Sequence, residues 1–352
     1  MVFSASSMSN TYFYDGDALF FTRKQAIAIV LGLFGMFATM NMHYSKLKKL
    51  TLPFFLVVFV ALLLVPFVGH EANGARSWFK VGPLSLQPAE FAKLSLIMYL
   101  AYLISNKKER YLDFKRGLLP ALAIICIMTG LILLQPDFGT AMVLMCISLV
   151  LLAVGGANLK HLGLTIGAGA AAGSLALAII LLVNPAFVNS HHFDRIYAFL
   201  DPWADERGIG WHIVNSMYAF GHGGLTGAGF GQSVQKLHYL AAPHNDFIFS
   251  IIGEELGFIG ATIFLLVYLL FLWRGLIVAL RCPDPFGNLV GVGIVLMIGI
   301  QALINLCGVT NMIPLTGVTL PLISYGGSSM LMTLTSIGIL LGLSREQRQR
   351  KS

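Results

Sequence analysis

The sequence at residues 244–273 is HNDFIFSIIGEELGFIGATIFLLVYLLFLW, which is apolar over most of its length. A helix needs about 20 mainly apolar residues to cross a lipid bilayer, so we predict a membrane span at residues 247–273. The span is unusual because three carboxylates, Asp246, Glu254 and Glu255, lie at its start. An ionised carboxylate is costly in lipid, so these side chains must face protein, water or substrate.

The rest of the chain repeats this apolar pattern. Of its 352 residues 57% are hydrophobic and 11% charged, whereas a soluble domain has about 25% charged residues. The sequence therefore predicts an all-α polytopic membrane protein, a bundle of nine transmembrane helices in a single integral membrane domain over residues 1–352. The predicted spans are 25–43, 50–69, 89–105, 117–134, 138–156, 160–183, 247–273, 288–308 and 321–343.

The distribution of basic residues orients the predicted spans. If the C-terminus is cytoplasmic, fifteen of the 23 Lys and Arg residues fall in short cytoplasmic segments beside the spans, as the positive-inside rule requires. The net charge of +7 is thus interpreted as a topology signal, with no nucleic acid as partner. A large extracytoplasmic loop then covers residues 184–246, and parts of it, such as WHIVNSMYAF, are candidates for short interfacial helices.

The three carboxylates divide into two groups. Asp246 lies at the outer mouth of its span, where a general base can meet water and substrate, although Asp is also a favoured helix N-cap. Glu254 and Glu255 follow eight and nine residues later, about 12 Å deeper along a straight helix. Carboxylates inside a membrane are usually paired, so we expect these two to be structural.

A second polar group lies at residues 73–94, NGARSWFKVGPLSLQPAEFAKL. Glu90 and Lys93 are three residues apart, so they share one face of the predicted helix. They form either a local ion pair or, together with Arg76, a site for an anionic head group that uses Arg76 and Lys93 as phosphate contacts.

A third group lies at residues 313–329, where Pro and Gly interrupt the apolar pattern. Irregular backbone at membrane depth occurs where it is buried in protein or lines a cavity, and Ser324 and Tyr325 supply polar groups there. A tight turn with a cap is as good an interpretation as substrate contact. The histidines have no HExxH-like spacing, so no metal ligands are assigned.

Five motifs together resemble the SEDS (shape, elongation, division and sporulation) family of peptidoglycan glycosyltransferases, which includes FtsW, RodA and SpoVE. They occur in the family's order and cover most of the chain, and their form is closer to FtsW and SpoVE than to RodA. The motifs are ARSWFKVGPLSLQPAEFAKL (75–94), QPDFGT (135–140), FGHGGLTGAGFGQSVQKLHYL (220–240), HNDFIFSIIGEELGFIG (244–260) and PLTGVTLPLISYGGSS (314–329).

The resemblance implies polymerisation of lipid II, an undecaprenyl-pyrophosphate-linked disaccharide-pentapeptide, at the outer face of the bacterial cytoplasmic membrane. It makes Asp246 the essential acid, assigns functional importance to Arg76, Glu90 and Lys93, and allows a divalent cation (magnesium or manganese) beside the pyrophosphate. The implied partners are a class B penicillin-binding protein transpeptidase and other cell-wall synthesis or divisome proteins.

Two further expectations concern alternatives to this function and the number of helices. A lipid II flippase and a non-enzymatic scaffold for a penicillin-binding protein are the alternative functions. The SEDS family has ten membrane helices, and the opening MVFSASS resembles the tail of the first of them, so nine spans are expected.

Overall fold

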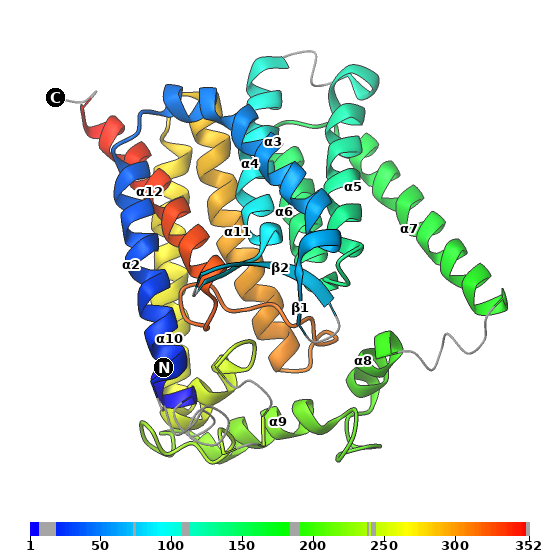
Figure 1. Cartoon of the computed structure of the whole chain (residues 1–352), viewed down its shortest axis with the longest axis vertical. Helices are drawn as coiled ribbons and strands as arrows, with labels where there is room; N and C mark the ends of the chain where they lie inside the picture. Colours follow the sequence, from blue (N-terminus) through cyan, green and yellow to red (C-terminus); the bar gives the residue numbers. More distant parts are fainter. Residues whose placement is uncertain are drawn as a thin grey trace.

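The computed structural model is a helical bundle (Figure 1) and describes residues 1–6, 19–72, 75–82, 84–107, 113–183, 191–237, 239–240 and 244–349. Within these ranges every one of the nine predicted spans coincides with a long helix, so the predicted polytopic helical fold is confirmed. The spans correspond to α2 (Phe20–Met40), α3 (Tyr44–Val68), α4 (Pro88–Lys107), α5 (Leu119–Leu133), α6 (Phe138–Val154), α7 (Leu159–Val183), α10 (Ile248–Leu280), α11 (Pro285–Val309) and α12 (Gly327–Gln349).

Length and hydropathy identify which of these helices could cross a membrane. Among the described residues, six segments are long and apolar enough to cross a membrane, and the first turn of one of them, before α5, is a π-helix, η2 (Phe114–Leu118). Helix α6 is a shorter apolar helix of 17 residues. The six segments are α2, α3, η2 with α5, α10, α11 and α12.

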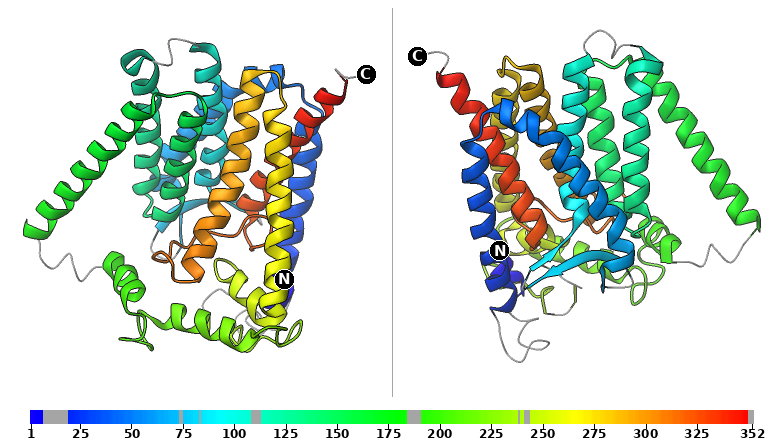
Figure 2. Two further views of the ribbon diagram at one scale, coloured as in Figure 1. Left: turned by 180° about the vertical axis from the view of Figure 1, so that it is seen from behind. Right: turned by 45° about the horizontal axis from the view of Figure 1, so that its top comes forward.

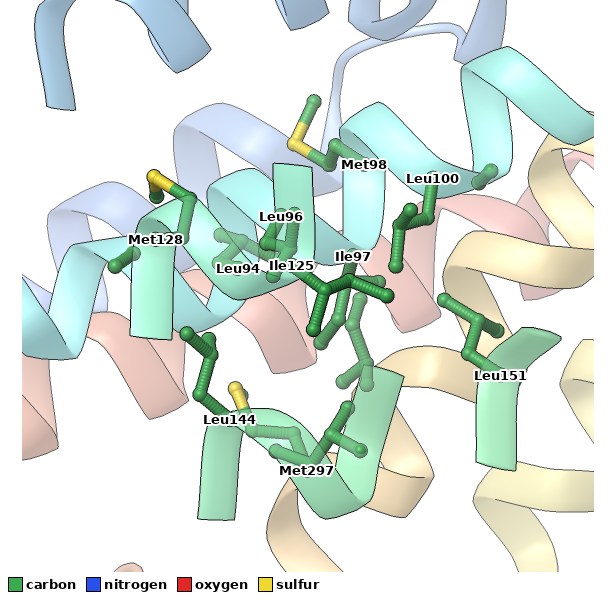
Figure 3. Close-up of a cluster of buried hydrophobic side chains, with 14 of the residues drawn as sticks. Leu94, Leu96, Ile97, Met98, Leu100, Ile125, Met128, Leu144, Leu151 and Met297 are labelled. Atoms are coloured by element: carbon green, nitrogen blue, oxygen red, sulfur yellow. The ribbon is translucent and has the colours of Figure 1, made fainter. Parts of the chain in front are cut away.

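The core of the bundle lies between α3, α4, α5, α6 and α11, and Figure 3 shows part of it. Side chains such as Ile97, Met128 and Leu144 are fully buried there. Helix α4 runs antiparallel to α11, because Ile97 lies against Gly293 while Lys93 contacts Gln301. Lipid is as apolar as these side chains, so close packing and interhelical hydrogen bonds hold the helices together.

Helix α7 leans away from this core in every view (Figures 1 and 2). By contrast, α2 and α12 lie side by side along one flank, where Gly338 of α12 closely approaches Met36 of α2. Most of the polar groups described below lie on or directly before α4, α6, α10, α11 and α12.

A small antiparallel sheet joins α3 to α4, a feature that the all-α prediction missed. Its strands pair in the order β1-β2-β3, with Glu71 opposite Arg76 and Lys80 opposite Ser85. Strands of three to seven residues carry too few alternations to stand out from a loop. The strands are β1 (His70–Ala72), β2 (Ala75–Val81) and β3 (Leu84–Leu86).

Two short helices, α8 (His191–Leu200) and α9 (Trp211–Gly223), belong to the segment predicted as a large loop. Figure 1 shows α9 lying across one end of the bundle, which we call the α9 end. The hydroxyl of Ser216 in α9 donates to the carbonyl of Val309 at the end of α11, 2.8 Å away. The last turn of α11 therefore lies at the α9 end. Because α4 runs antiparallel to α11, the first turn of α4 and the sheet that precedes it lie at this end too.

Helix α10 is kinked at Gly257, so the predicted span at 247–273 is not one continuous helix. Its 33 residues would be about 50 Å long when straight, well over the roughly 30 Å of a hydrocarbon core. Gly257 has φ 67° and ψ −172°, a conformation that is essentially restricted to glycine. The 23 residues after the kink are enough to cross the membrane.

The part of α10 before the kink runs alongside α9. The ring of Phe247 lies 5.9 Å from that of His212, and the Oγ atoms of Ser216 and Ser250 are 2.8 Å apart. Glu254 and Glu255 therefore lie in a layer with α9, and the 12 Å depth expected from a straight helix does not apply to them.

We expect Gly257→Ala to lower the free energy of unfolding by about 1–3 kcal/mol, the usual cost of a residue forced into a sparsely populated backbone region. A Cβ atom there would also collide with the backbone of Leu225 and Gly227. Thermal unfolding of the purified protein in detergent measures the loss. Gly130→Ala is the control because a Cβ at Gly130 meets open space, and equal stability of the two variants would contradict the prediction.

Candidate functional site

Asp246 lies in the turn that precedes α10, at the α9 end of the bundle, and its side chain is partly exposed. Asn305 of α11 donates a hydrogen bond from Nδ2 to the backbone carbonyl of Asp246, 2.8 Å away. Burial raises the pKa of the Asp246 carboxyl to about 6, although a backbone hydrogen bond and the charge of Arg195 on α8 act in the opposite direction. A pKa near the working pH suits a group that accepts a proton.

The turn around Asp246 is held from three sides. The backbone N–H of Tyr325 donates to the carbonyl of His244 at 2.8 Å. The rings of His244, Phe21 and Tyr325 form one cluster, with the centroid of His244 4.3 Å from that of Phe21 and 5.5 Å from that of Tyr325. His244 is buried, which lowers its pKa to about 4 and leaves the ring neutral at pH 7. Tyr325 thus supports the turn through its backbone and its ring.

Ser324 is a buried turn residue in the structure. Its hydroxyl accepts a hydrogen bond from the N–H of Leu320, 2.8 Å away, and its carbonyl accepts one from Gln25 Nε2. These contacts match the turn-and-cap interpretation of the segment. Direct contact of Ser324 and Tyr325 with substrate remains a prediction.

Lys93 and Glu90 form a buried ion pair on α4. Their side chains are only 3% and 9% exposed, with Nζ 2.8 Å from Glu90 Oε1. Nζ also donates to Oε1 of Gln301 on α11, 2.6 Å away. The ammonium group of Lys93 is thus bonded to Glu90 and Gln301, which is what the local ion-pair interpretation predicts.

Arg76 occupies different surroundings from Lys93. It is exposed on β2, and its Nε lies 3.3 Å from a carboxylate oxygen of Glu71 on β1. An exposed pair of this kind adds less than about 1 kcal/mol, so the guanidinium is available to a ligand. The structure does not bring Arg76 and Lys93 into contact as one cationic cluster.

Gln301 and Asn305 are polar side chains of the site that the sequence analysis did not identify. They lie four residues apart on one face of α11, and both are buried. Gln301 donates to the carbonyl of Thr319 at 3.0 Å, and Asn305 donates to that of Val318 at 2.7 Å and to Asp246. The sequence could have identified them, because two amide side chains four residues apart in an apolar helix lie on one face, and polar residues inside membrane spans mark functional or structural sites.

Asp137 is a further carboxyl beside the buried pair on α4. It caps α6 by accepting the N–H of Thr140 at 3.0 Å, and it accepts a hydrogen bond from Gln87 Nε2 at 2.8 Å. Burial raises its pKa, and the charges of Glu90 and Lys93 act on it in opposite senses. Asp137 is therefore part of the same polar region at the start of α4.

Glu254 and Glu255 are both fully buried and both bonded to protein groups. Glu254 accepts hydrogen bonds from the hydroxyl of Ser233 and from the N–H of Val234, and it lies 2.9 Å from His222 Nδ1. Glu255 pairs with Lys236, whose Nζ is 3.1 Å from Oε1. These contacts tie the first part of α10 to the segment that follows α9.

A metal ion held by protein needs several ligands in one place. Among the described residues, no three His, Cys, Asp or Glu side chains converge as they would around an ion held by the protein alone. The described side chains around Asp246 therefore do not hold a metal ion by themselves.

The sequence is similar to a family of known proteins over almost its whole length. Residues 1–349 match the family model of FtsW, RodA and SpoVE, described as cell cycle proteins. Stage V sporulation protein E of Bacillus subtilis is 44% identical, over 99% of this chain and 93% of that protein. A probable peptidoglycan glycosyltransferase FtsW of Trichlorobacter lovleyi is 39% identical, over 98% of this chain and 88% of that protein.

Solved structures give the same result. A chain from a study of how a peptidoglycan synthase complex coordinates polymerization and crosslinking superposes with a TM-score of 0.74 at 32% identity, covering 99% of this chain and 96% of that one. The rod shape determining protein RodA of Thermus thermophilus superposes with a TM-score of 0.66 at 31% identity, covering 98% and 94%.

Proposed function

The chain belongs to the FtsW, RodA and SpoVE family of cell cycle proteins, and on that premise we propose that it is a peptidoglycan glycosyltransferase that polymerises lipid II. One observation carries the proposal: Asp246 is a partly exposed carboxyl with a pKa of about 6 at the α9 end of a membrane bundle. A lipid-linked sugar reacts at a membrane surface, and proton transfer there needs a base at that level.

In the proposed reaction, Asp246 accepts the proton of the acceptor sugar hydroxyl as its oxygen attacks the anomeric carbon of the growing chain. A new glycosidic C–O bond forms, and the bond from the anomeric carbon to the lipid pyrophosphate breaks. The bonding electrons leave with the pyrophosphate. A single displacement of this kind inverts the anomeric carbon and needs one base, with no covalent intermediate on the enzyme.

Basic side chains near the site support the leaving group in this proposal. Arg195 lies within electrostatic reach of Asp246, and Arg76 is exposed on β2. Guanidinium groups bind phosphate oxygens in a bidentate manner, and fixed positive charge stabilises the negative charge that develops on departing pyrophosphate. Lys93 is buried and bonded to Glu90 and Gln301, so in this proposal it stabilises the fold around the site and does not contact the pyrophosphate.

The protein is a multi-pass membrane protein, and we place it in the bacterial cytoplasmic membrane with the α9 end outside and the C-terminus in the cytoplasm. The concentration of Lys and Arg beside the opposite ends of the spans supports this orientation. A class B penicillin-binding protein is the proposed partner, because one similar structure comes from a peptidoglycan synthase complex.

The experiment that tests the function is polymerisation of lipid II by the purified protein, alone and with its transpeptidase partner. Glycan strands that depend on Asp246 support the glycosyltransferase. Transfer of lipid II across a liposome membrane without polymer supports a flippase instead. Rescue of cells by an Asp246→Ala protein that still binds its partner supports a scaffold.

The rate of polymerisation is expected to fall as the pH drops through about 6. Asp246 serves as the base only when its carboxyl is ionised, and a group with a pKa of about 6 is about one-tenth ionised at pH 5. The initial rate should therefore be about tenfold lower at pH 5 than at pH 8. Initial rates measured from pH 5 to 8 check this, and a flat profile would contradict the assignment.

A further inference from the structure

A pocket with a volume of about 500 Å³ lies between α9 and the segment that follows it. Pockets of roughly 300–1,000 Å³ suit small organic ligands, and the mechanism above makes no use of this one. Residues from one face of α9 and from two adjacent positions after it line the pocket. They are Met217, Tyr218, Gly221, His222, Val234 and Gln235.

His222 is fixed in the wall of this pocket. Its Nδ1 lies 2.9 Å from Oε1 of Glu254, whose carboxylate is fully buried and also accepts the hydroxyl of Ser233 and the N–H of Val234. The side chain of His222 remains half exposed. A carboxylate that accepts Nδ1–H orients the ring and leaves Nε2 for another partner, so the pocket has a hydrogen-bonding group of fixed direction.

One exposed aromatic ring, that of Tyr218, lies next to His222 in the pocket wall, and a second, that of Trp203, packs against Tyr218 from outside the lining. Tyr218 is one helical turn away on the same face of α9, and the ring of Trp203 packs edge-on against it with centroids 5.8 Å apart. Their side chains are 50% and 47% exposed. Half-exposed aromatic rings of this kind offer an apolar face together with a polar edge.

Gln235 adds an unsatisfied amide. Its Oε1 has no hydrogen-bond partner among the described residues, although the atom is buried. An unpaired buried acceptor costs about 1–3 kcal/mol, and a ligand hydroxyl or N–H could supply the missing donor after a small rotation of the amide. The pocket thus combines aromatic faces, a fixed imidazole and a free amide oxygen.

This combination fits a sugar. A pyranose ring has apolar C–H faces that stack on aromatic rings, and its edge carries hydroxyl groups that bond to imidazole and amide groups. An acyl chain would leave the imidazole and the amide unpaired. A phosphate would gain little from Tyr218 and Trp203.

The pocket is separate from the turn at Asp246. Helix α9 runs parallel to the first part of α10, with His212 beside Phe247 and His222 beside Glu254. Ten residues of α9 and seven of α10 separate those two contacts, which is about 10–15 Å at about 1.5 Å per residue. Several linked sugar rings are needed to span that distance, so the reacting sugar cannot occupy both places.

We propose that the pocket formed by Tyr218, His222 and Gln235 binds a saccharide unit of the glycan strand, several sugars away from the bond that Asp246 helps to form. The proposal rests on the glycosyltransferase function proposed above. A strand held at a second point dissociates less often between successive additions, so the pocket would lengthen the product.

Binding is tested without turnover. The probe is the N-acetylglucosamine tetramer, titrated into the purified full-length protein by calorimetry, with intrinsic tryptophan fluorescence, to which Trp203 contributes, as a second signal. We expect His222→Gln and Tyr218→Ala each to weaken binding about tenfold, the loss of about 1.4 kcal/mol. Tyr197→Ala is the matched control, because Tyr197 is a similarly exposed tyrosine on α8, and it should bind the tetramer as the parent does.

A second measurement follows the length of glycan strands made from lipid II. Both pocket variants should yield shorter strands than the parent and the Tyr197→Ala control. Any of three results would overturn the proposal. The parent protein does not bind the tetramer, both pocket variants bind it as the parent does, or both make strands of parental length. Thermal unfolding of each variant identifies any loss of fold, and two variants of different chemistry keep the test decisive if one is unstable.

Failure of the pocket and failure of the proposed base give different results. Asp246→Asn protein should bind the tetramer with the parental affinity while it polymerises lipid II about 10²–10⁴-fold more slowly. If Asp246→Asn polymerises normally but the pocket variants lose binding, the base is wrong and the saccharide pocket stands. If the pocket variants bind normally while Asp246→Asn is inactive, the pocket is wrong and the glycosyltransferase assignment stands.

Discussion

Replacing Asp246 with Asn is expected to lower the rate of lipid II polymerisation by about 10²–10⁴-fold, the usual contribution of a general base. The amide cannot accept the proton of the acceptor hydroxyl, while its shape matches that of the carboxyl. The hydrogen bond from Asn305 goes to the backbone carbonyl of residue 246, so the turn should persist. The initial rate with purified protein and lipid II measures the effect.

Asp205→Asn is the control for this substitution. Asp205 is exposed in the same segment of the chain, between α8 and α9, and its carboxylate accepts the N–H of Ile209 at 3.1 Å. The control makes the same change of charge and should keep a rate within twofold of the parent. A fully active Asp246→Asn protein with unchanged thermal stability would rule out Asp246 as the base.

Lys93→Met is expected to lower the free energy of unfolding by about 3–5 kcal/mol, the usual cost of leaving one member of a buried ion pair without its partner. The side chain of Glu90 is 9% exposed, and without Lys93 its charge has lost the ammonium group 2.8 Å away. Gln301 Oε1 loses a hydrogen bond as well. Denaturant unfolding of the purified protein in detergent gives the value.

The double variant Glu90→Gln/Lys93→Met separates structure from substrate binding. Replacing both charges by neutral groups is often neutral or stabilising, so most of the stability should return. Since Nζ is buried and bonded within the protein, we expect polymerisation to return with it. A stable but inactive double variant would instead assign the Glu90 and Lys93 pair to the substrate, the other of the two interpretations of the sequence.

The matched control for these measurements is Lys80→Met on β2. Lys80 is exposed, and substitutions of exposed side chains usually change stability by less than about 0.5 kcal/mol. A loss at Lys93 no larger than that at Lys80 would show that the ion pair contributes nothing measurable.

The membrane spans were predictable because their signal is local. Each spanning helix must satisfy its own backbone hydrogen bonds inside lipid, so about 20 apolar residues suffice to identify it. The helices found at 44–68 and 285–309 agree closely with the spans predicted at 50–69 and 288–308. Asp246 was predicted for the same reason, because it directly precedes such a run.

The surroundings of the site residues were not predictable in the same way. Lys93 is bonded to Gln301, which is 208 residues away in the sequence, and Asp246 is held by Asn305 on a different helix. No local pattern links these pairs, since they depend on how α4 and α10 pack against α11. The sheet at residues 70–86 was missed because its strands are short.

By itself, the sequence determined the family, the helical membrane fold and the position of a carboxylate at the mouth of a span. Only the tertiary structure decided what surrounds that carboxylate and where the neighbouring acids lie. The chain contains 37 glycines, and nothing local distinguishes Gly257 from the others. The N–H groups of Phe258 and Ile259, directly after the kink, donate to the carbonyls of Gly224 and Leu225 in the segment that follows α9. Packing of α10 against α9 and this segment places Glu254 beside His222 and Glu255 beside Lys236 at the α9 end.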